Sequence, residues 1–386
     1  MAPGRRAPGR QDLVETAPMD RPAEIAVKHQ RVAEYLRAHG LGAAVLSRRC
    51  NFSWYTAGAH NHVAAACDVG NSWLCVTAHR AVAVTSNIEA PRLREEELAG
   101  TDIDVLEFPH EQPARAGRII RSVIGGAAAA DAEVPGLDMP ALEADFDRLR
   151  WVLTDAEIRR YRVAAAETAR AVEAVARSAQ PGQTESELAG LLSAELLRRD
   201  CTPWVLLVAA DERVARFRHP LPTRRPADRY VMLATCAERG GLIAACTRLA
   251  CFGALPEDLA RKHRAVATVD AAMIAATRPG ATLGDIFAEA QRTYAATGFP
   301  EEWRRHHQGG STGYLPRERK ASPGDTTPVL ACQAFAWNPS IAGTKSEDTI
   351  LCLEGGAQPL ADPTDWPVVE TDWNGRKMPR PAILER

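Results

Sequence analysis

The sequence has almost no net charge and no long apolar run. Lys and Arg total 47 against 49 Asp and Glu, a formal net charge of −2, which argues against electrostatic capture of nucleic acid or of an anionic membrane. No stretch approaches the roughly 18 consecutive apolar residues that a membrane helix needs. Residues 1–20 have no apolar core of the signal-peptide type, so we expect a flexible tail there. We therefore expect a cytoplasmic protein that binds neither nucleic acid nor membrane.

The nine cysteines are dispersed, and none stands in a C-x-x-C pair. This spacing excludes zinc ribbons and thioredoxin-type sites. Single cysteines in apolar segments, such as Cys75, Cys251 and Cys352, are typical of core residues in a reducing compartment. With 46% hydrophobic and 25% charged residues, the composition is that of a globular protein that buries a large core without disulfides.

Helical and strand-like segments alternate in the first 150 residues. Ile25, Val32 and Leu36 share one face of a predicted helix over residues 21–39. Three β-prone runs and two further helical segments follow, over residues 43–46, 73–77, 81–85, 91–98 and 114–123. This interleaving predicts a smaller α/β domain over residues 21–152.

The rest of the chain contains an internal repeat. The segments AQPGQTESELAGLL and TRPGATLGDIFAEA each place a Pro-Gly turn before a helix start, with the prolines at 181 and 279, 98 residues apart. A capping-box pattern follows each turn. A third one stands at the start of the long helix that precedes the first turn. The pairs are Thr154 with Glu157, Thr184 with Glu187, and Thr282 with Asp285. Strand-like segments follow both copies, so we expect a duplicated α+β domain over residues 153–360 with a site between its halves.

The last 26 residues, 361–386, carry four prolines and little periodicity. We expect them to form a tail that wraps the surface or a partner subunit rather than a domain of their own.

Several ordered motifs resemble those of a known superfamily. The segments are His219-Pro-Leu-Pro-Thr, residues 230–248, His307-Gln-Gly-Gly, Phe335-Ala-Trp-Asn-Pro and Ser346-Glu-Asp-Thr. They are similar to the core of the creatinase and aminopeptidase superfamily, whose members include Xaa-Pro aminopeptidases, prolidases, methionine aminopeptidases and creatinase. Asn51-Phe-Ser-Trp-Tyr-Thr-Ala-Gly resembles a turn of the creatinase N-terminal domain. The resemblance covers about residues 21–356 and implies an α+β fold. It implies a pita-bread C-terminal domain with a pseudo-twofold repeat, preceded by a creatinase-type α/β domain.

The resemblance also shows which metal ligands are missing. Peptidases of this superfamily hold two divalent cations with two aspartates, one histidine and two glutamates. The matching positions here are Ala234, Ala245, His307, Asn338 and Glu347. Methyl groups offer no electron pair, and one imidazole with one carboxylate cannot balance two dications. We therefore predict no metal and no cofactor, and not a dinuclear metallopeptidase, while a single weak metal on His307 and Glu347 stays open.

Other polar residues remain at positions that the superfamily uses. His219 matches a substrate-contacting histidine, whose counterpart in creatinase transfers a proton in a metal-free reaction. Histidine suits this role because its reference pKa is about 6.5. Glu347 is expected to orient that imidazole or bind a cationic group. His307 is expected to act as a second acid or to donate to an oxyanion, and Tyr314 to supply a hydrogen bond or a proton.

Four more residues complete the candidate site. Asn338 and Arg248 are expected to bind substrate. The superfamily usually forms a homodimer in which the N-terminal domain of one subunit covers the cavity of the other, so Tyr55 and His60 are expected to line the partner's site. Structural roles stay open for the same residues: His219 as a strand cap, His307 in a turn under the sheet, and Arg248 in a Thr-Arg sequence pair that the resemblance marks as structural.

The leading hypothesis is a metal-independent enzyme that cleaves a C–N bond in a small polar nitrogen-containing molecule. Cleavage would be by hydrolysis or elimination, with His219 as the main acid–base residue. One alternative is an inactive binding or scaffold protein, like the peptidase-like domain of a eukaryotic histone chaperone. The other is an Xaa-Pro peptidase with residual metal dependence. An open pocket shared by His219, His307 and Glu347 favours the enzyme, and a pocket plugged by Trp337 favours binding.

Overall fold

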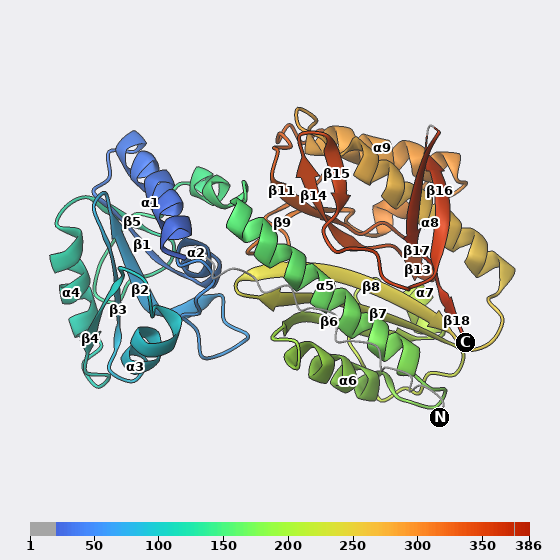
Figure 1. Cartoon of the computed structure of the whole chain (residues 1–386), viewed down its shortest axis with the longest axis horizontal. Coiled ribbons are helices and arrows are strands. Elements are labelled where there is room, and N and C mark those ends of the chain that lie inside the picture. The colour runs from blue at the N-terminus through green and yellow to red at the C-terminus, as the bar shows by residue number, and fades with distance from the viewer. Residues whose placement is uncertain (1–20, 374) are drawn as a thin grey trace, which may run out of the picture.

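The computed structural model describes residues 21–373 and 375–386. The tail expected over residues 1–20 lies outside these residues. Two lobes follow one another along the chain, a smaller N-terminal lobe and a larger C-terminal lobe (Figure 1). Within the described residues, no helix combines the length and the apolar character needed to cross a bilayer.

The N-terminal lobe is a five-stranded sheet with helices around it. Its elements are α1 (Arg21–Ala38), β1 (Ala43–Arg48), α2 (Arg49–Tyr55), β2 (Val69–Thr77), β3 (Ala81–Ser86), α3 (Ala90–Arg92), the π-helix η1 (Leu93–Glu97), β4 (Asp104–Phe108), α4 (Ala114–Ile124), β5 (Ala128–Ala130) and the 3-10 helix η2 (Ala144–Arg150). The strand order is β4-β3-β2-β1-β5. The segment resembling a turn at residues 51–58 is mostly helical instead, because α2 runs through residue 55 and only then turns at Ala57, where φ is 56°.

The C-terminal lobe is built on a nine-stranded sheet. Its helices are α5 (Asp155–Ser178), α6 (Glu185–Leu197), α7 (Glu212–Arg216), α8 (Glu257–Ala276), α9 (Leu283–Ala296) and the 3-10 helix η3 (Glu302–Arg305). Its strands are β6 (Thr202–Ala210), β7 (Tyr230–Arg239), β8 (Leu242–Cys251), β9 (Gly309–Thr312), β10 (Arg319–Lys320), β11 (Gln333–Trp337), β12 (Ser340–Ile341), β13 (Thr344–Lys345), β14 (Asp348–Leu353) and β15 (Gly356–Pro359). The main strand order is β10-β9-β11-β14-β8-β7-β6, with β15 on β14.

The three capping boxes are confirmed. In each, the threonine side chain accepts from the backbone N–H three residues on, and the acidic side chain there returns a bond to the threonine N–H. The two later cap residues also make equivalent antiparallel bridges, Thr184 with Pro226 and Thr282 with Pro328. The helix pairs α5–α6 and α8–α9 flank the two halves of the sheet (Figure 1), which is the arrangement that a duplicated unit produces.

The C-terminal residues have more structure than expected. A hairpin of β16 (Val368–Trp373) and β17 (Arg376–Pro381) packs against α8, and β18 (Leu384–Glu385) adds to the edge of β8 in parallel. Residues 361–386 thus pack on the C-terminal lobe as a segment with strands, and the expected contact with a partner subunit stays a prediction. The prolines did not prevent strand formation, because two of them, Pro379 and Pro381, lie within a two-stranded ribbon with no further strand beyond it.

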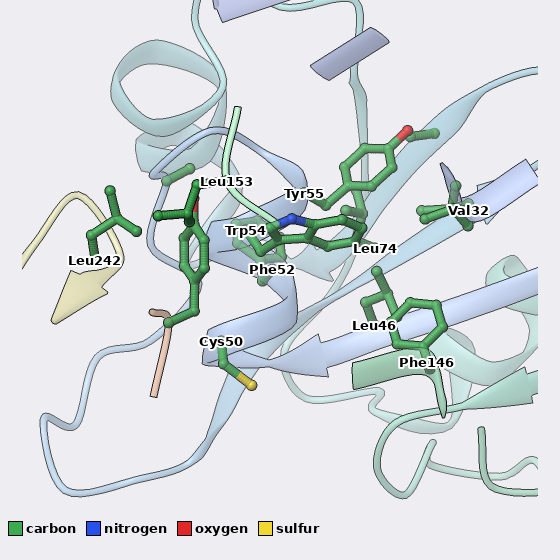
Figure 2. Close-up of a cluster of buried hydrophobic side chains, with 14 of the residues drawn as sticks. Val32, Leu46, Cys50, Phe52, Trp54, Tyr55, Leu74, Phe146, Leu153 and Leu242 are labelled. Atoms are coloured by element: carbon green, nitrogen blue, oxygen red, sulfur yellow. The ribbon is translucent and has the colours of Figure 1, made fainter. Parts of the chain in front are cut away.

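One hydrophobic cluster joins the two lobes. Figure 2 shows Phe52 and Trp54 of α2 packed near Leu153, with Leu242 of the β7–β8 hairpin approaching from the other lobe. The hairpin tip needs a glycine at position 241, where φ is +80° and an added Cβ would lie 2.7 Å from the Cβ of Ser53. The hairpin that carries much of the candidate site is thereby held in place by the N-terminal lobe.

Candidate active site

A cavity of about 370 Å³ lies next to β6 and β7. Its polar lining consists of His219, Thr235, His307, Arg317, Lys320, Asn338, Lys345 and Glu347. Its apolar wall is formed by Val205, Leu207, Ala234, Cys236 and Pro316. Four of the eight predicted site residues, His219, His307, Asn338 and Glu347, therefore share this cavity, whereas Arg248, Tyr314, Tyr55 and His60 do not line it. Trp337 is buried and donates from its indole N–H to Thr277 at 2.9 Å, so it does not plug the cavity.

The register of β7 and β8 fixes which side chains face the cavity. Ala234 pairs with Thr247 and Cys236 with Ala245, and residues that pair directly, or lie two apart, point to one face of a sheet. Two methyl groups, a thiol and a hydroxyl thus stand together on this face. Burial raises the pKa of Cys236 to about 11, so the thiol is a packing group there.

Glu347 is the one carboxylate of the cavity, and it is fully engaged. Its Oε1 accepts from Arg317 Nη2 at 2.9 Å. Its Oε2 accepts from Lys345 Nζ at 2.6 Å and from Thr247 Oγ1 at 2.7 Å. Burial opposes ionisation of Glu347, but Lys345 and Arg317 outweigh it and lower its pKa to about 2. Glu347 is therefore an anion already held by two protein cations.

A pair of histidines meets at the mouth of the cavity. The Nε2 atoms of His219 and His306 lie 3.0 Å apart, and His306 Nδ1 lies 3.2 Å from Ser340 Oγ. Only one hydrogen can lie between the two Nε2 atoms, so one ring donates and the other accepts. His219 is exposed, whereas His306 is buried. From the sequence, the adjacent residues His306 and His307 indicated only a turn. Nothing in the sequence indicated that His306 would contact His219.

The three histidines are neutral at neutral pH. Burial, then Lys345, lowers the pKa of His219, with Glu347 acting in the opposite sense. Burial, then Lys345, lowers the pKa of His306 to about 2, and burial, then Arg317, lowers that of His307 to about 3. His307 Nδ1 accepts from the N–H of Gly309 at 3.3 Å, which leaves the proton of the neutral ring on Nε2 as a donor.

The family of the chain follows from comparison with known proteins. Residues 159–356, just over half of the chain, match the profile of metallopeptidase family M24. The chain belongs to family M24. No match was found among curated proteins.

Solved structures confirm the α+β pita-bread fold. Dipeptidase PepE from Mycobacterium ulcerans is 20% identical with a TM-score of 0.71, over 89% of this chain and 97% of that one. An X-Pro aminopeptidase from Thermotoga maritima is 14% identical with a TM-score of 0.74, over 93% and 99%. The N-terminal domain of a FACT complex subunit from Cicer arietinum (chickpea) is 12% identical with a TM-score of 0.65, over 87% and 96%. Identities this low establish the shared fold and nothing finer.

The M24 chain lacks a donor set for a dinuclear centre. Ala234 and Ala245 contribute only methyl groups, and both oxygens of Glu347 already accept from a cation. The single metal considered on His307 and Glu347 meets the same obstacle, because a dication would have to displace Lys345 or Arg317 from the carboxylate. The residues present do not fit the metals of the family.

One other group of donors lies close together in the described part of the chain. The ring nitrogens of His219, His306 and His307 lie within 4.8 Å of one another, and histidine is a common ligand of transition metals. The cations Lys345, Arg317 and Lys320 act on these same rings, however, and repel a dication. Glu347 acts on these rings in the opposite sense, but it is already paired with Lys345 and Arg317.

Tyr314 was expected in the site, and this expectation is wrong. Its side chain is 1% exposed and lies at the junction of the lobes, against the hairpin glycine 241. Its hydroxyl donates to Glu157 at 2.7 Å and lies 3.3 Å from Lys28 Nζ. Tyr314 lies just beyond the end of β9, and its side chain points to the junction of the lobes, although Pro316, Arg317 and Lys320 further along the chain line the cavity.

Arg248 does not reach the cavity either. It follows Thr247 on β8 and so points to the opposite face of the sheet. There its Nε lies 3.0 Å from Glu173 and its Nη1 lies 2.8 Å from Asp348, beside a separate cavity of about 130 Å³. The structural role that the sequence left open for Arg248 fits this position, and substrate binding does not.

The two residues expected to line a partner's site differ in exposure. Tyr55 is 1% exposed and its hydroxyl is 2.7 Å from His29 Nδ1, so it has no surface to offer another subunit and that expectation is wrong. The His60 side chain is one-third exposed, and its Nε2 is 3.7 Å from Glu238. Its contact with a partner stays a prediction, as does the homodimer itself.

Proposed function

We propose that this M24 protein is a metal-independent hydrolase of a C–N bond in a small polar nitrogen-containing molecule. The observation that carries the proposal is the contact of 3.0 Å between the exposed His219 and the buried His306, beside an open cavity. It supplies an acid–base residue with a second group that holds it in place, in a cavity where three of the five positions that match family metal ligands carry other residues.

His219 is the general base in this proposal. In the tautomer that suits the role, its Nε2–H donates to His306 Nε2, and the other ring nitrogen of His306 faces Ser340 Oγ. The Nδ1 of His219 makes no hydrogen bond to any described residue, so its lone pair is open to a water molecule. The low pKa of His306 keeps it neutral, and it therefore remains an acceptor when His219 becomes protonated. His306 is a positioning residue.

The reaction balances with water as the only second reactant. His219 takes a proton from water while the water oxygen bonds to the carbon of the C–N group. The N–H of His307 and the guanidinium of Arg317 stabilise the charge on the tetrahedral intermediate. The C–N bond then breaks, and the proton on His219 passes to the leaving nitrogen. The products are an amine and a compound with a hydroxyl group on the former C–N carbon, such as the carboxylic acid that an amide gives.

A substrate screen tests this proposal. The full chain is treated with EDTA and assayed against amides, amidines and ureas, and the substrate found is then used with His219→Asn. We expect kcat to fall by about 10²- to 10⁴-fold, the usual contribution of general acid–base catalysis. His110→Asn is the matched control, because its side chain is 59% exposed on the N-terminal lobe. Unchanged turnover by His219→Asn overturns the mechanism.

The alternatives give different results in the same assay. Incorporation of ¹⁸O from labelled water distinguishes hydrolysis from elimination. Activity that returns only with added manganese or cobalt supports a residual Xaa-Pro peptidase. No turnover of any compound, together with capture of a protein partner by the cavity face, supports the binding protein, a role for which the open cavity gives no support.

A further inference from the structure

A second cavity, of about 130 Å³, lies on the face of the sheet opposite the candidate active site. We call it the rear cavity. Ala165 and Ala169 of α5 form one wall, and Trp366 with prolines of the C-terminal residues forms another. Three charged side chains complete the lining: Arg248 of β8, Asp348 of β14 and Arg380 of β17. The rear cavity therefore combines apolar walls with a small polar part, as ligand sites do.

Each arginine of the rear cavity has one terminal nitrogen without a partner. Arg248 donates through Nε to Glu173 and through Nη1 to Asp348, but its Nη2 makes no hydrogen bond to a described residue. Arg380 uses Nε and Nη2 on Asp270 and Asp348, and its Nη1 likewise has no acceptor among the described residues. The two side chains are 6% and 2% exposed, yet neither nitrogen is fully enclosed by protein atoms. Buried donors are nearly always satisfied, so these two point to an acceptor on a molecule in the cavity that both arginines line.

The charges around these nitrogens favour a neutral occupant. The two guanidinium groups are paired with three carboxylates, those of Glu173, Asp270 and Asp348, and Asp362 adds a fourth carboxylate to the lining. An anion would meet this excess of negative charge. A cation is disfavoured as well, because the open atoms are donors and each oxygen of Asp348 already accepts from an arginine. A neutral molecule with an oxygen acceptor meets neither obstacle.

We propose that the rear cavity binds a small neutral molecule that carries a carbonyl oxygen on an apolar body. The oxygen accepts from the open nitrogens of Arg248 and Arg380, which lie on either side of one carboxylate, and the body packs against Ala169 and Trp366. An engineered cavity of about 150 Å³ holds one benzene molecule. A volume of about 130 Å³ therefore limits the occupant to about six non-hydrogen atoms. The inference does not depend on the proposed function, since His219 does not line this cavity.

The lining of the rear cavity comes from both halves of the duplicated domain. α5 and β8 belong to the first half, and β14 and β15 belong to the second. Among the described residues, β8 is in register with β14 only at Cys246 and Asp348. A molecule in the rear cavity would therefore join the two halves at the place where the sheet has a single pair in register. It would also contact the two strands that carry Thr247 and Glu347 on their other face.

Four probes of about six non-hydrogen atoms test the ligand class. Cyclopentanone carries the carbonyl, methylenecyclopentane has a methylene group in place of the oxygen, cyclopentylamine is a cation, and cyclopropanecarboxylate is an anion. Binding to the full chain is followed by methyl NMR of alanine-labelled protein. The signals of Ala165 and Ala169 report on the rear cavity, and that of Ala234 reports on the cavity beside β6 and β7.

We expect cyclopentanone to shift the signals of Ala165 and Ala169 and to bind at least about tenfold more tightly than each of the other three probes. Equal binding of cyclopentanone and methylenecyclopentane overturns the inference, because the guanidinium donors then contribute nothing. Tighter binding of the amine or the acid, shifts confined to Ala234, or no binding of any probe also overturns it.

Variants locate the site and the donors. Ala169→Leu fills the rear cavity from α5 and is expected to abolish the binding of cyclopentanone. Ala174→Leu is the matched control, because Ala174 lies on the same helix and does not line the cavity. Arg248→Lys keeps a cation beside Asp348 but lacks Nη2, so the preference for cyclopentanone over methylenecyclopentane should fall about tenfold.

Thermal melts first establish that each variant is folded. A folded Ala169→Leu protein that binds cyclopentanone as tightly as the parent chain contradicts the assigned site. A folded Arg248→Lys protein that keeps the full preference for the ketone contradicts the role of the guanidinium groups. If Arg248→Lys does not fold, the four probes and the pair Ala169→Leu and Ala174→Leu still decide the proposal.

Discussion

Two charged clusters lie on opposite faces of the sheet at β8 and β14, and they differ in how completely their charges are paired. The cavity cluster is Glu347 with Arg317, Lys320 and Lys345. The rear cluster is Arg248, Arg380, Glu173, Asp270 and Asp348. Neighbouring residues in the chain point to opposite faces of the sheet. Thr247 and Glu347 face the cavity, and the residues that follow them, Arg248 and Asp348, face the rear.

In the rear cluster, every charged side chain has an ion-pair partner within the cluster. Arg380 binds Asp270 through Nε at 2.8 Å and Asp348 through Nη2 at 2.9 Å, and Arg248 binds Asp348 and Glu173. Its three carboxylates outnumber its two guanidinium groups. The cavity cluster has an excess of cations and buried atoms without partners. Charges that satisfy one another hold a fold together, whereas charges that do not are available to a ligand.

Removing an arginine of the rear cluster gives the largest expected change in stability. Arg248→Met leaves Glu173 and Asp348 without their shared cation, and breaking a buried pair costs about 3–5 kcal/mol. Urea unfolding monitored by circular dichroism measures the loss. Lys320→Met is the control in the cavity cluster, expected to change the free energy of unfolding by less than about 0.5 kcal/mol. Similar losses in both variants would remove the distinction between the clusters.

Neutralising Glu347 sharpens the comparison further. Glu347→Gln frees Arg317 and Lys345, which then repel one another, so we expect a loss of about 1–3 kcal/mol in unfolding free energy. Urea unfolding of the variant and the parent chain measures the loss. An unchanged free energy of unfolding would show that Glu347 is not the anion that holds these two cations in place.

Acid is expected to weaken the fold through the cavity histidines. The pKa values of His306 and His307 are lowered from 6.5 to about 2 and about 3 in the folded chain. Between those values and 6.5 the unfolded chain binds more protons, so stability falls as pH decreases below 6.5. The loss is at most about 1.4 kcal/mol per pH unit for each histidine. Unfolding at pH 7 and pH 5.5 measures it, and His306→Asn should show a smaller loss. An equal loss in this variant would show that other groups are responsible.

Chelation should have the smallest effect. EDTA is expected to leave both the melting temperature and turnover unchanged, because Lys345 and Arg317 occupy the oxygens of Glu347. Thermal melts with and without manganese complete the test. Stabilisation by manganese that His307→Asn abolishes would show that the three-histidine cluster holds a metal after all.

The sequence predicted those features that depend on residues close together in the chain. A threonine with an acidic residue three positions later predicted each of the three capped helix starts. Two alanines eleven residues apart, on neighbouring strands, indicated that family metal ligands are missing. Contacts between distant segments were not accessible. Arg317 and Glu347 are thirty residues apart, and His219 and His306 are separated by 87. Tyr314 was placed wrongly because a constant spacing does not show where the chain leaves the sheet.

The pairing of Lys345 with Glu347 limits how this site could change during evolution. A single substitution of Ala234 or Ala245 by aspartate would add an anion among three cations, and the new carboxylate would pair with Arg317, Lys320 or Lys345 before it met a metal. Each family ligand would thus bring no metal affinity until a neighbouring cation was also lost. A metallopeptidase site at this position would therefore require several coordinated changes.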